Sequence, residues 1–145
     1  MGKKFYSIEI VVYSYSLIHT EDNGYLILGS EGYVNQRSMF VIKVDYQGNQ
    51  EWSQTYPLGS ISYGLFANQT LDGGYILSGL TITDSDSDIY IIKISNDGSK
   101  EWEKVITLYD NDASSQAVQL SGGNYFISAT SNIGWETERL HSYLG

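Results

Sequence analysis

The feature that most constrains this sequence is a repeat with a period of 50 residues. Several landmarks recur at that spacing: Glu51-Trp52 as Glu101-Trp102, Gly48 as Gly98, and Ile42-Lys43 as Ile92-Lys93. A further set occurs three times, as Asp22-Asn23-Gly24-Tyr25, Asp72-Gly73-Gly74-Tyr75 and Gly122-Gly123-Asn124-Tyr125. Self-similarity at one fixed spacing is the signature of repeat architectures, in which each period forms one supersecondary unit. The chain is therefore expected to be an array of similar units.

Each period divides into four short segments of strand-forming residues, separated by turns rich in Asp, Asn and Gly. We name these expected strands A to D. Strand A is expected at 15–20, 64–70 and 114–120, and strand B at 25–30, 75–80 and 125–130. Strand C is expected at 39–45 and 89–95, and strand D at 51–56 and 101–107. Tight turns between such strands favour hairpins, so each unit is predicted to be an antiparallel four-stranded meander.

The composition agrees with an all-β domain. Thirteen Tyr, fifteen Gly and a single Pro suit strands joined by tight turns better than helices. The net charge of −9 would repel the phosphates of nucleic acids and an anionic membrane surface, so neither is an expected partner. The chain has no Cys, which excludes disulfides and thiolate metal sites.

The start of the chain has some of the features of an export signal. Lys3 and Lys4 precede a partly apolar stretch at 5–18, but Glu9 and several Tyr and Ser residues interrupt that stretch, and no small-residue cleavage site follows. We interpret it as a strand, so the chain shows no clear signal peptide. No segment approaches the roughly 20 apolar residues of a membrane-spanning helix.

The repeat resembles a known class of sequence. The segments 44–52 and 94–102 resemble the Asp, Gly and Trp signature of quinoprotein-like (PQQ-like) propeller repeats, and 72–79 and 89–94 are similar to repeats of uncharacterised bacterial and archaeal cell-surface propellers. The resemblance implies a β-propeller architecture and an extracellular or cell-surface location. The Asp-box of sialidase-like propellers is not matched, because Gly98 directly follows Asp97. Glycosidase chemistry is therefore not implied.

The phase of the repeat predicts about three blades in one domain, 1–145. Strand D is expected at 3–8, followed by blades at 14–57 and 63–108 and a partial blade at 113–145. The last strand C, at 137–144, carries polar residues where the other copies are apolar. Propellers have about four to eight blades. The predicted fold is thus a partial propeller, completed either by copies of this chain or by the remainder of a larger propeller.

One loop carries a candidate metal site. Asp84, Asp86 and Asp88 place three carboxylates at alternate positions between strands B and C, a spacing that can surround one Ca²⁺ with oxygen ligands. The loop motif does not continue with the expected Gly and distant Glu, and 34–38 in the preceding copy is not acidic. A solvated acidic loop is the competing interpretation. No other cofactor is expected.

Aromatic and polar residues at repeated positions have two interpretations. Those at fixed register are Tyr25, Tyr75, Tyr125, Trp52 and Trp102, with Gly48 and Gly98 in the preceding turns. Recurrence predicts packing between blades rather than stacking on a ligand. Trp135 lies outside the pattern and is a candidate sugar platform. His19, Gln69 and Gln119 share a register in strand A and predict a polar ring, either structural or for a small ligand.

Three functions are compatible with this sequence. The first is a non-catalytic structural or interaction module of a secreted or cell-surface propeller protein, which fits the repeat, the acidic charge and the lack of a recognisable catalytic constellation. The second is a carbohydrate-binding propeller lectin with one site per blade. The third is a fragment of a propeller enzyme whose active site lies elsewhere. The fold cannot choose among them, because function resides in sites on the scaffold.

Overall fold

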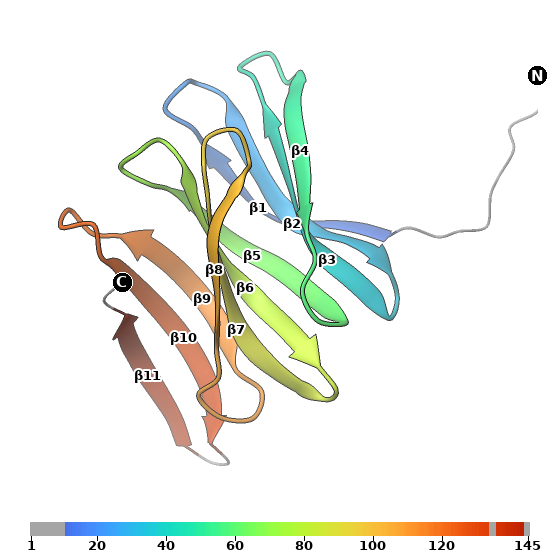
Figure 1. Ribbon diagram of the computed structural model, residues 1–145, viewed down its shortest axis with the longest axis vertical. Helices are drawn as coiled ribbons and strands as arrows, with labels where there is room; N and C mark the ends of the chain where they lie inside the picture. The colour runs from blue at the N-terminus through green and yellow to red at the C-terminus, as the bar shows by residue number, and fades with distance from the viewer. Residues whose placement is uncertain (1–10, 134–135, 144–145) are drawn as a thin grey trace, which may run out of the picture.

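The chain folds entirely into β-strands and turns over the residues that the computed structural model describes, 11–133 and 136–143 (Figure 1). The first four strands are β1 (Val11–His19), β2 (Tyr25–Tyr33), β3 (Gln36–Val44) and β4 (Gln50–Tyr56). The next four are β5 (Ile61–Gln69), β6 (Tyr75–Thr83), β7 (Asp86–Ile94) and β8 (Lys100–Ile106). The last three are β9 (Ala113–Gln119), β10 (Tyr125–Ile133) and β11 (Glu136–Tyr143). The all-β prediction is confirmed.

The strands group into three successive repeat units. Antiparallel pairing joins β1 to β4 in chain order, and likewise β5 to β8. A parallel pairing of Arg37 with Ile61 connects these two meanders, so that hydrogen bonding defines one eight-stranded sheet. Strands β9, β10 and β11 form a separate three-stranded sheet. We call these groups units 1, 2 and 3. The described sheets are open, without a closed ring of strands.

Each unit carries a β-bulge at the same place. The pairing of β1 with β2 skips Tyr15, that of β5 with β6 skips Leu65, and that of β9 with β10 skips Ser115. A second bulge skips Glu51 between β3 and β4, and Glu101 between β7 and β8. Bulges bend a strand and re-aim the extra side chain. Their 50-residue spacing shows that the sequence repeat is also a repeat of backbone register.

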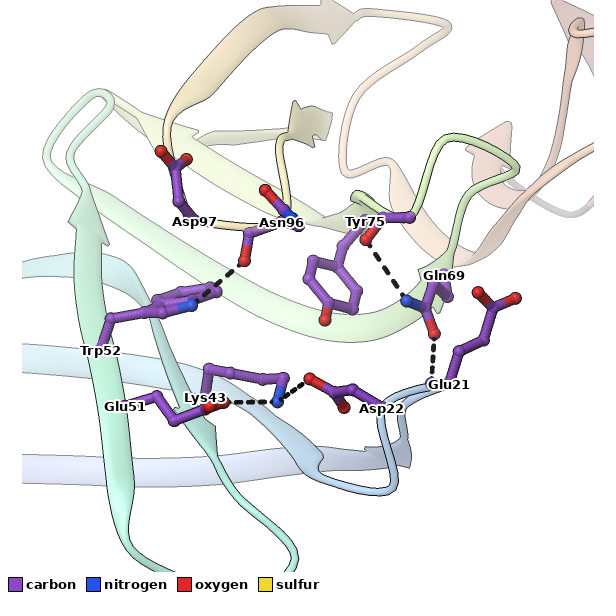
Figure 2. Close-up of a pocket in the computed structure, with 10 residues that line it drawn as sticks. Glu21, Asp22, Lys43, Glu51, Trp52, Gln69, Tyr75, Asn96 and Asp97 are labelled. Carbon is purple, nitrogen blue, oxygen red and sulfur yellow. Dashed lines mark hydrogen bonds and ion pairs between the residues drawn. The ribbon is translucent and has the colours of Figure 1, made fainter.

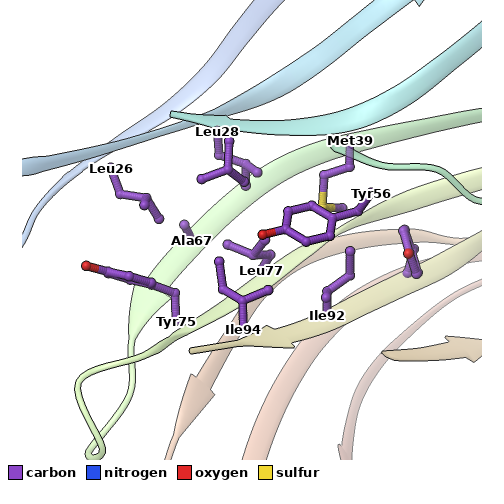
Figure 3. Packing of buried hydrophobic residues seen from close by; sticks show 11 residues of the cluster. Leu26, Leu28, Met39, Tyr56, Ala67, Tyr75, Leu77, Ile92 and Ile94 are labelled. Atoms are coloured by element: carbon purple, nitrogen blue, oxygen red, sulfur yellow. The ribbon is translucent and has the colours of Figure 1, made fainter. Parts of the chain in front are cut away.

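The units pack face to face, and the core lies between them (Figure 3). Alternate residues of a strand point to opposite faces of the sheet. In unit 2, Tyr90 and Ile92 therefore pack against unit 1, whereas Ile89 and Ile91 pack against unit 3. Burial on both faces explains why 89–92 is a continuous apolar run rather than an alternating one.

Two of the expected strands and Trp135 lie near the ends of the chain. The polar segment predicted as the last strand C forms a strand, since β11 pairs with β10 from Ile133↔Glu136 to Tyr125↔Tyr143. The expected strand D at 3–8 and Trp135 lie outside the described residues. Within the described part of the chain, no helix is long and apolar enough to cross a membrane.

Candidate functional site

The most unusual side chains of the molecule are two buried lysines at the same place in units 1 and 2. Lys43 on β3 is 2% exposed and Lys93 on β7 is 1% exposed. An ammonium group removed from water is costly unless charged partners and hydrogen bonds compensate it. The surroundings of both lysines provide that compensation in the same way, as an ion triad of one lysine and two acids.

The geometry of the two triads is nearly identical. Lys43 Nζ lies 2.8 Å from Asp22 Oδ2 and 2.7 Å from Glu51 Oε2, and it donates a hydrogen bond to the Val44 carbonyl at 3.2 Å. Lys93 Nζ lies 3.0 Å from both Asp72 Oδ2 and Glu101 Oε2, and it donates to the Ile94 carbonyl at 3.1 Å. Three acceptors therefore satisfy the three N–H donors of each ammonium.

Local backbone structure positions the acids. Glu51 is the residue skipped by the second bulge, which explains how a strand residue can turn its carboxylate toward Lys43. Asp22 accepts hydrogen bonds from the Gly24 N–H at 3.0 Å and from the Thr20 hydroxyl, so it closes the β1–β2 turn as well as pairing with the lysine. A Cβ at Gly24 would lie 2.5 Å from Lys43 Nζ and would contact the Val44 carbonyl.

The triads hold their groups in the charged state. Hydrogen bonds from Lys43 and Thr20 lower the pKa of Asp22 from 3.8 to about 2, and those from Thr70 and Lys93 do the same for Asp72. Burial by itself would lower the pKa of both lysines, but their hydrogen bonds to the paired acids outweigh it and raise that pKa above 10.5. Asp22, Asp72 and both lysines are therefore charged at neutral pH.

Unit 3 lacks a triad. Gly122 and Asn124 stand where units 1 and 2 have the Asp of the turn and the Gly at 24 or 74. Ser142 pairs with Phe126, at the register where Leu26 pairs with Lys43 and Ile76 with Lys93. Without an ammonium at this position, a residue larger than Gly fits in the turn. The substitution at 124 is thus consistent with the loss of the lysine.

A cavity of about 430 Å³ opens beside the first triad, at the seam between units 1 and 2 (Figure 2). Unit 1 contributes Glu21, Asp22, Lys43, Glu51 and Trp52, and unit 2 contributes Gln69, Gly73, Tyr75, Asn96 and Asp97. We call it the seam cavity. Its volume lies within the range typical of small-molecule sites. Four of its lining side chains are carboxylates and one is an ammonium, so the cavity is acidic.

Several lining residues hold the two units together. The Trp52 indole N–H donates to the Asn96 carbonyl at 3.2 Å, and the nearby Tyr56 hydroxyl donates to the Gly98 carbonyl at 2.6 Å. The β7–β8 turn of unit 2 is thus held by two aromatic side chains of β4. A Cβ at Gly98 would lie 2.8 Å from the Trp52 ring, whereas nothing lies within 4 Å of the equivalent position at Gly48.

The glutamines predicted to form a polar ring also connect units. Gln69 Oε1 accepts the Glu21 N–H at 2.9 Å, and Gln119 Oε1 accepts the Leu71 N–H at 2.9 Å. Each amide then donates to a carbonyl of its own turn, Gly73 or Gly123. His19, at the same register in unit 1, instead packs edge-on against Tyr25 at 5.4 Å. The two glutamine amides are therefore committed to structure.

Tyr75 is a lining residue with spare hydrogen-bonding capacity. Its side chain is 2% exposed, and its hydroxyl has no hydrogen-bond partner among the described residues. Figure 2 shows the ring extending from unit 2 into the cavity, toward the side of Lys43. Among the described residues, the buried side-chain polar atom without a partner is Ser30 Oγ, so the Tyr75 hydroxyl is not fully enclosed and opens onto the seam cavity. The equivalent Tyr125 lies beside Trp102, with ring centroids 5.2 Å apart and nearly perpendicular.

The three aspartates of the acidic loop are placed along the β6–β7 hairpin. Asp84 lies in the loop with a φ of 60°, Asp86 begins β7 opposite Thr83, and Asp88 pairs with Thr81. Among the residues that the structure describes, no group of three or more His, Asp or Glu side chains is arranged to hold a metal ion. The chain does not bring these three carboxylates together, and their binding of Ca²⁺ stays a prediction.

The triads were not recognised from sequence, although their residues were. Asp22, Lys43 and Glu51 all recur 50 residues later. The available signal was a lysine inside the strands 39–45 and 89–95, which are otherwise apolar, because an unpaired lysine is not tolerated in a core. Comparisons with known proteins add no assignment: neither family models nor curated proteins match this chain.

Proposed function

We propose that this chain is a non-catalytic structural and interaction module, built from propeller-type blades and working at the cell surface or outside the cell. The observation that carries the proposal is the repeated use of the polar residues in the fold. Lys43 and Lys93, with their acids, support the strands, and Gln69 and Gln119 join the units. Residues that recur for structural reasons are not thereby available for chemistry.

The direction of the pKa shifts supports a non-catalytic role. A general acid needs a carboxyl group with a raised pKa, and a catalytic lysine needs a lowered one. Here the pKa of Asp22, Asp72 and Asp97 falls to about 2, and that of both buried lysines rises. These groups are stabilised as permanent charges. The proposal accordingly includes no cofactor and no reacting group.

An activity screen tests this function. The purified chain should not turn over a panel of fluorogenic glycosides, esters and phosphates, nor reduce quinone dyes. As a control for trace contamination, any turnover is measured again in the Glu21→Gln and Asp97→Asn variants. Turnover that falls with either substitution would assign the seam cavity an enzymatic role and contradict the proposal.

Carbohydrate binding at the seam cavity is a second candidate function, favoured by the free Tyr75 hydroxyl. Sugars are bound by an aromatic side chain together with polar groups that orient the hydroxyls, and the cavity offers Trp52, Asn96 and Glu21. A glycan array tests it, with Tyr75→Phe as the variant that removes only the hydroxyl. Binding that weakens in Tyr75→Phe supports this function. An array without ligands, or equal binding by the variant, contradicts it.

A further inference from the structure

One face of unit 1 is the repeat counterpart of a buried interface. Unit 2 packs against unit 1 through six residues: Ala67, Tyr75, Leu77, Tyr90, Ile92 and Ile94. Their counterparts 50 residues earlier are Leu17, Tyr25, Ile27, Phe40, Ile42 and Val44. We call these six residues the outer face of unit 1. All except Tyr25 are aliphatic or Phe, so the face has the apolar character of the interface that it repeats.

The two faces differ in burial. In unit 2, Tyr75 is 2% exposed and Ala67 is 5% exposed. At the equivalent positions of unit 1, Tyr25 is 37% exposed and Leu17 is 62% exposed. The other four residues of the outer face are half-buried, whereas their counterparts in unit 2 are fully buried. Among the residues that the structure describes, nothing gives the outer face the cover that its counterpart in unit 2 receives.

The internal seams define what would cover this face. On the opposite side of a unit, Leu26, Met39 and Val41 of unit 1 pack against unit 2. Their counterparts Ile76, Ile89 and Ile91 pack against unit 3, where Ala117 and Ile127 receive them. The contact between units 1 and 2 is thus repeated between units 2 and 3, and in each case two different faces of the repeat meet. A head-to-tail contact of this kind can add further units, and it closes when the rotation between units permits a ring.

The hydrogen bonds between neighbouring units also indicate a further acceptor position in unit 1. Gln69 accepts the Glu21 N–H and Gln119 accepts the Leu71 N–H, each at 2.9 Å. His19 stands at the glutamine register in unit 1, exposed at the edge of the outer face beside Tyr25. A neutral imidazole nitrogen is an acceptor. The donor one period beyond Leu71 is the N–H of Ser121, in the β9–β10 turn.

We propose that the outer face of unit 1 binds unit 3 of a second copy of this chain, head to tail, with His19 accepting the Ser121 N–H of that copy. Phe126, at the position of Leu26 and Ile76, belongs to the face of unit 3 that meets it. Two copies bound reciprocally supply six units, within the four to eight that propellers use. The inference rests on the proposed function, an interaction module built from propeller-type blades, and it names the partner of that module.

The mass in solution tests the association. Analytical ultracentrifugation of the intact chain should show a dimer, with twice the 16.2 kDa of one chain. Leu17→Asp places a charge within the apolar contact and should weaken dimerisation about tenfold or more. The matched control is Val105→Asp on β8, where the wild-type side chain is 42% exposed and lies outside the outer face. The control should dimerise normally.

Cross-linking tests the orientation, because the chain contains no Cys. His19→Cys and Ser121→Cys are prepared as separate single variants and treated with a short bismaleimide. A mixture of the two should give covalent dimers, whereas each variant alone should give none. Covalent dimers of His19→Cys alone would indicate a symmetric contact between two outer faces, which would overturn the head-to-tail arrangement.

Other results overturn the association itself. A chain that is monomeric at all accessible concentrations, and that dimerises only after deletion of residues 2–10, would assign the outer face to that segment. A monomer that remains monomeric after the deletion would leave the face without an occupant and refute the docking. Neither result affects the stacking within one chain, because the contact of Trp52 with the turn at Gly98 is tested separately by its effect on stability.

Discussion

At the scale of the residue, Lys43 and Lys93 illustrate how a repeat tolerates a buried charge. Replacing a buried ion pair with apolar residues often leaves stability unchanged, whereas removing one partner leaves the other charge buried and unpaired. In each triad the ammonium is buried and both carboxylates reach the surface. The lysine therefore depends on its acids more than the acids depend on the lysine.

This asymmetry predicts the outcome of substitutions in the first triad. The double variant Asp22→Asn with Glu51→Gln leaves Lys43 buried without a carboxylate and should lower the free energy of unfolding by about 2 kcal/mol. That is less than the roughly 3–5 kcal/mol of a fully buried pair, because the carboxylates are partly solvated. Urea denaturation followed by Trp fluorescence measures it. Lys43→Met, which removes the buried charge, should cost less than the double variant. The reverse order would contradict this account of the triad.

The triads also predict the pH dependence of stability. Because the folded-state pKa of Asp22 and Asp72 is about 2 and the reference value is 3.8, their contribution is complete above 3.8 and is lost as pH falls toward 2. The lysines, whose pKa is raised, contribute fully below 10.5, and their contribution is lost as pH rises beyond it. The urea midpoint should be flat between these limits and fall outside them.

Matched variants attribute the acid side of this profile to the triads. Asp22→Asn combined with Asp72→Asn should flatten the loss of stability between about pH 4 and about pH 2. Asp86→Asn, at the exposed start of β7 and outside both triads, serves as the control and should leave the profile unchanged. An unchanged acid limb in the double variant would show that other carboxylates control acid unfolding.

At the scale of the element, the β7–β8 turn of unit 2 differs from the equivalent β3–β4 turn of unit 1 in its contact with a neighbouring unit. Gly98 and Gly48 have nearly the same positive φ, 85° and 87°, so replacing either with Ala strains the backbone equally. The two differ in their surroundings, because only Gly98 faces the Trp52 ring. A comparison of the same substitution at both positions therefore isolates the contact between units.

The prediction is that Gly98→Ala destabilises the chain more than Gly48→Ala. The shared part is the cost of Ala at positive φ, about 1 kcal/mol. The excess at Gly98 should be about 1–3 kcal/mol, the usual cost of forcing extra volume into a packed site. Thermal unfolding measures both, and Trp52→Ala should abolish the difference between them. Equal effects in the wild-type background would show that the turn can move away from Trp52 without cost.

At the scale of the whole molecule, unit 2 is the only described unit that is covered on both faces by other described units. Local opening requires less free energy where fewer apolar contacts are broken. In the Leu17→Asp variant, whose dimerisation is weakened, the amides of β6 and β7 should therefore exchange with deuterium more slowly than those of β2 and β3. Mass spectrometry of peptides covering 75–94 and 25–44 tests this, since the two segments are repeat counterparts. Equal protection in a dimer, together with faster exchange at 25–44 in Leu17→Asp, would locate the missing cover at the outer face.

Much of this architecture could be predicted from the sequence. The 50-residue period placed the turns around Asp22, Asp72 and Gly122, and the strands between them, because turn residues and apolar runs act locally. Segments that are buried on both faces, such as 89–94, were recognisable as strands from their composition. The bulges were not predicted, because a bulge depends on which residues of two strands pair.

The tertiary structure decided the roles of the repeated residues. Sequence marked Lys43, Trp52 and Gln69 as recurrent, but a fixed spacing does not say whether a side chain meets its own unit, the next unit or solvent. Only the packed units show that Lys43 is paired within unit 1, that Trp52 contacts the turn of unit 2, and that Gln69 connects the two. The physical reason is that turn chemistry and apolar runs are local properties, whereas ion pairing depends on how the strands of a unit pair, and burial depends on how one unit packs against another.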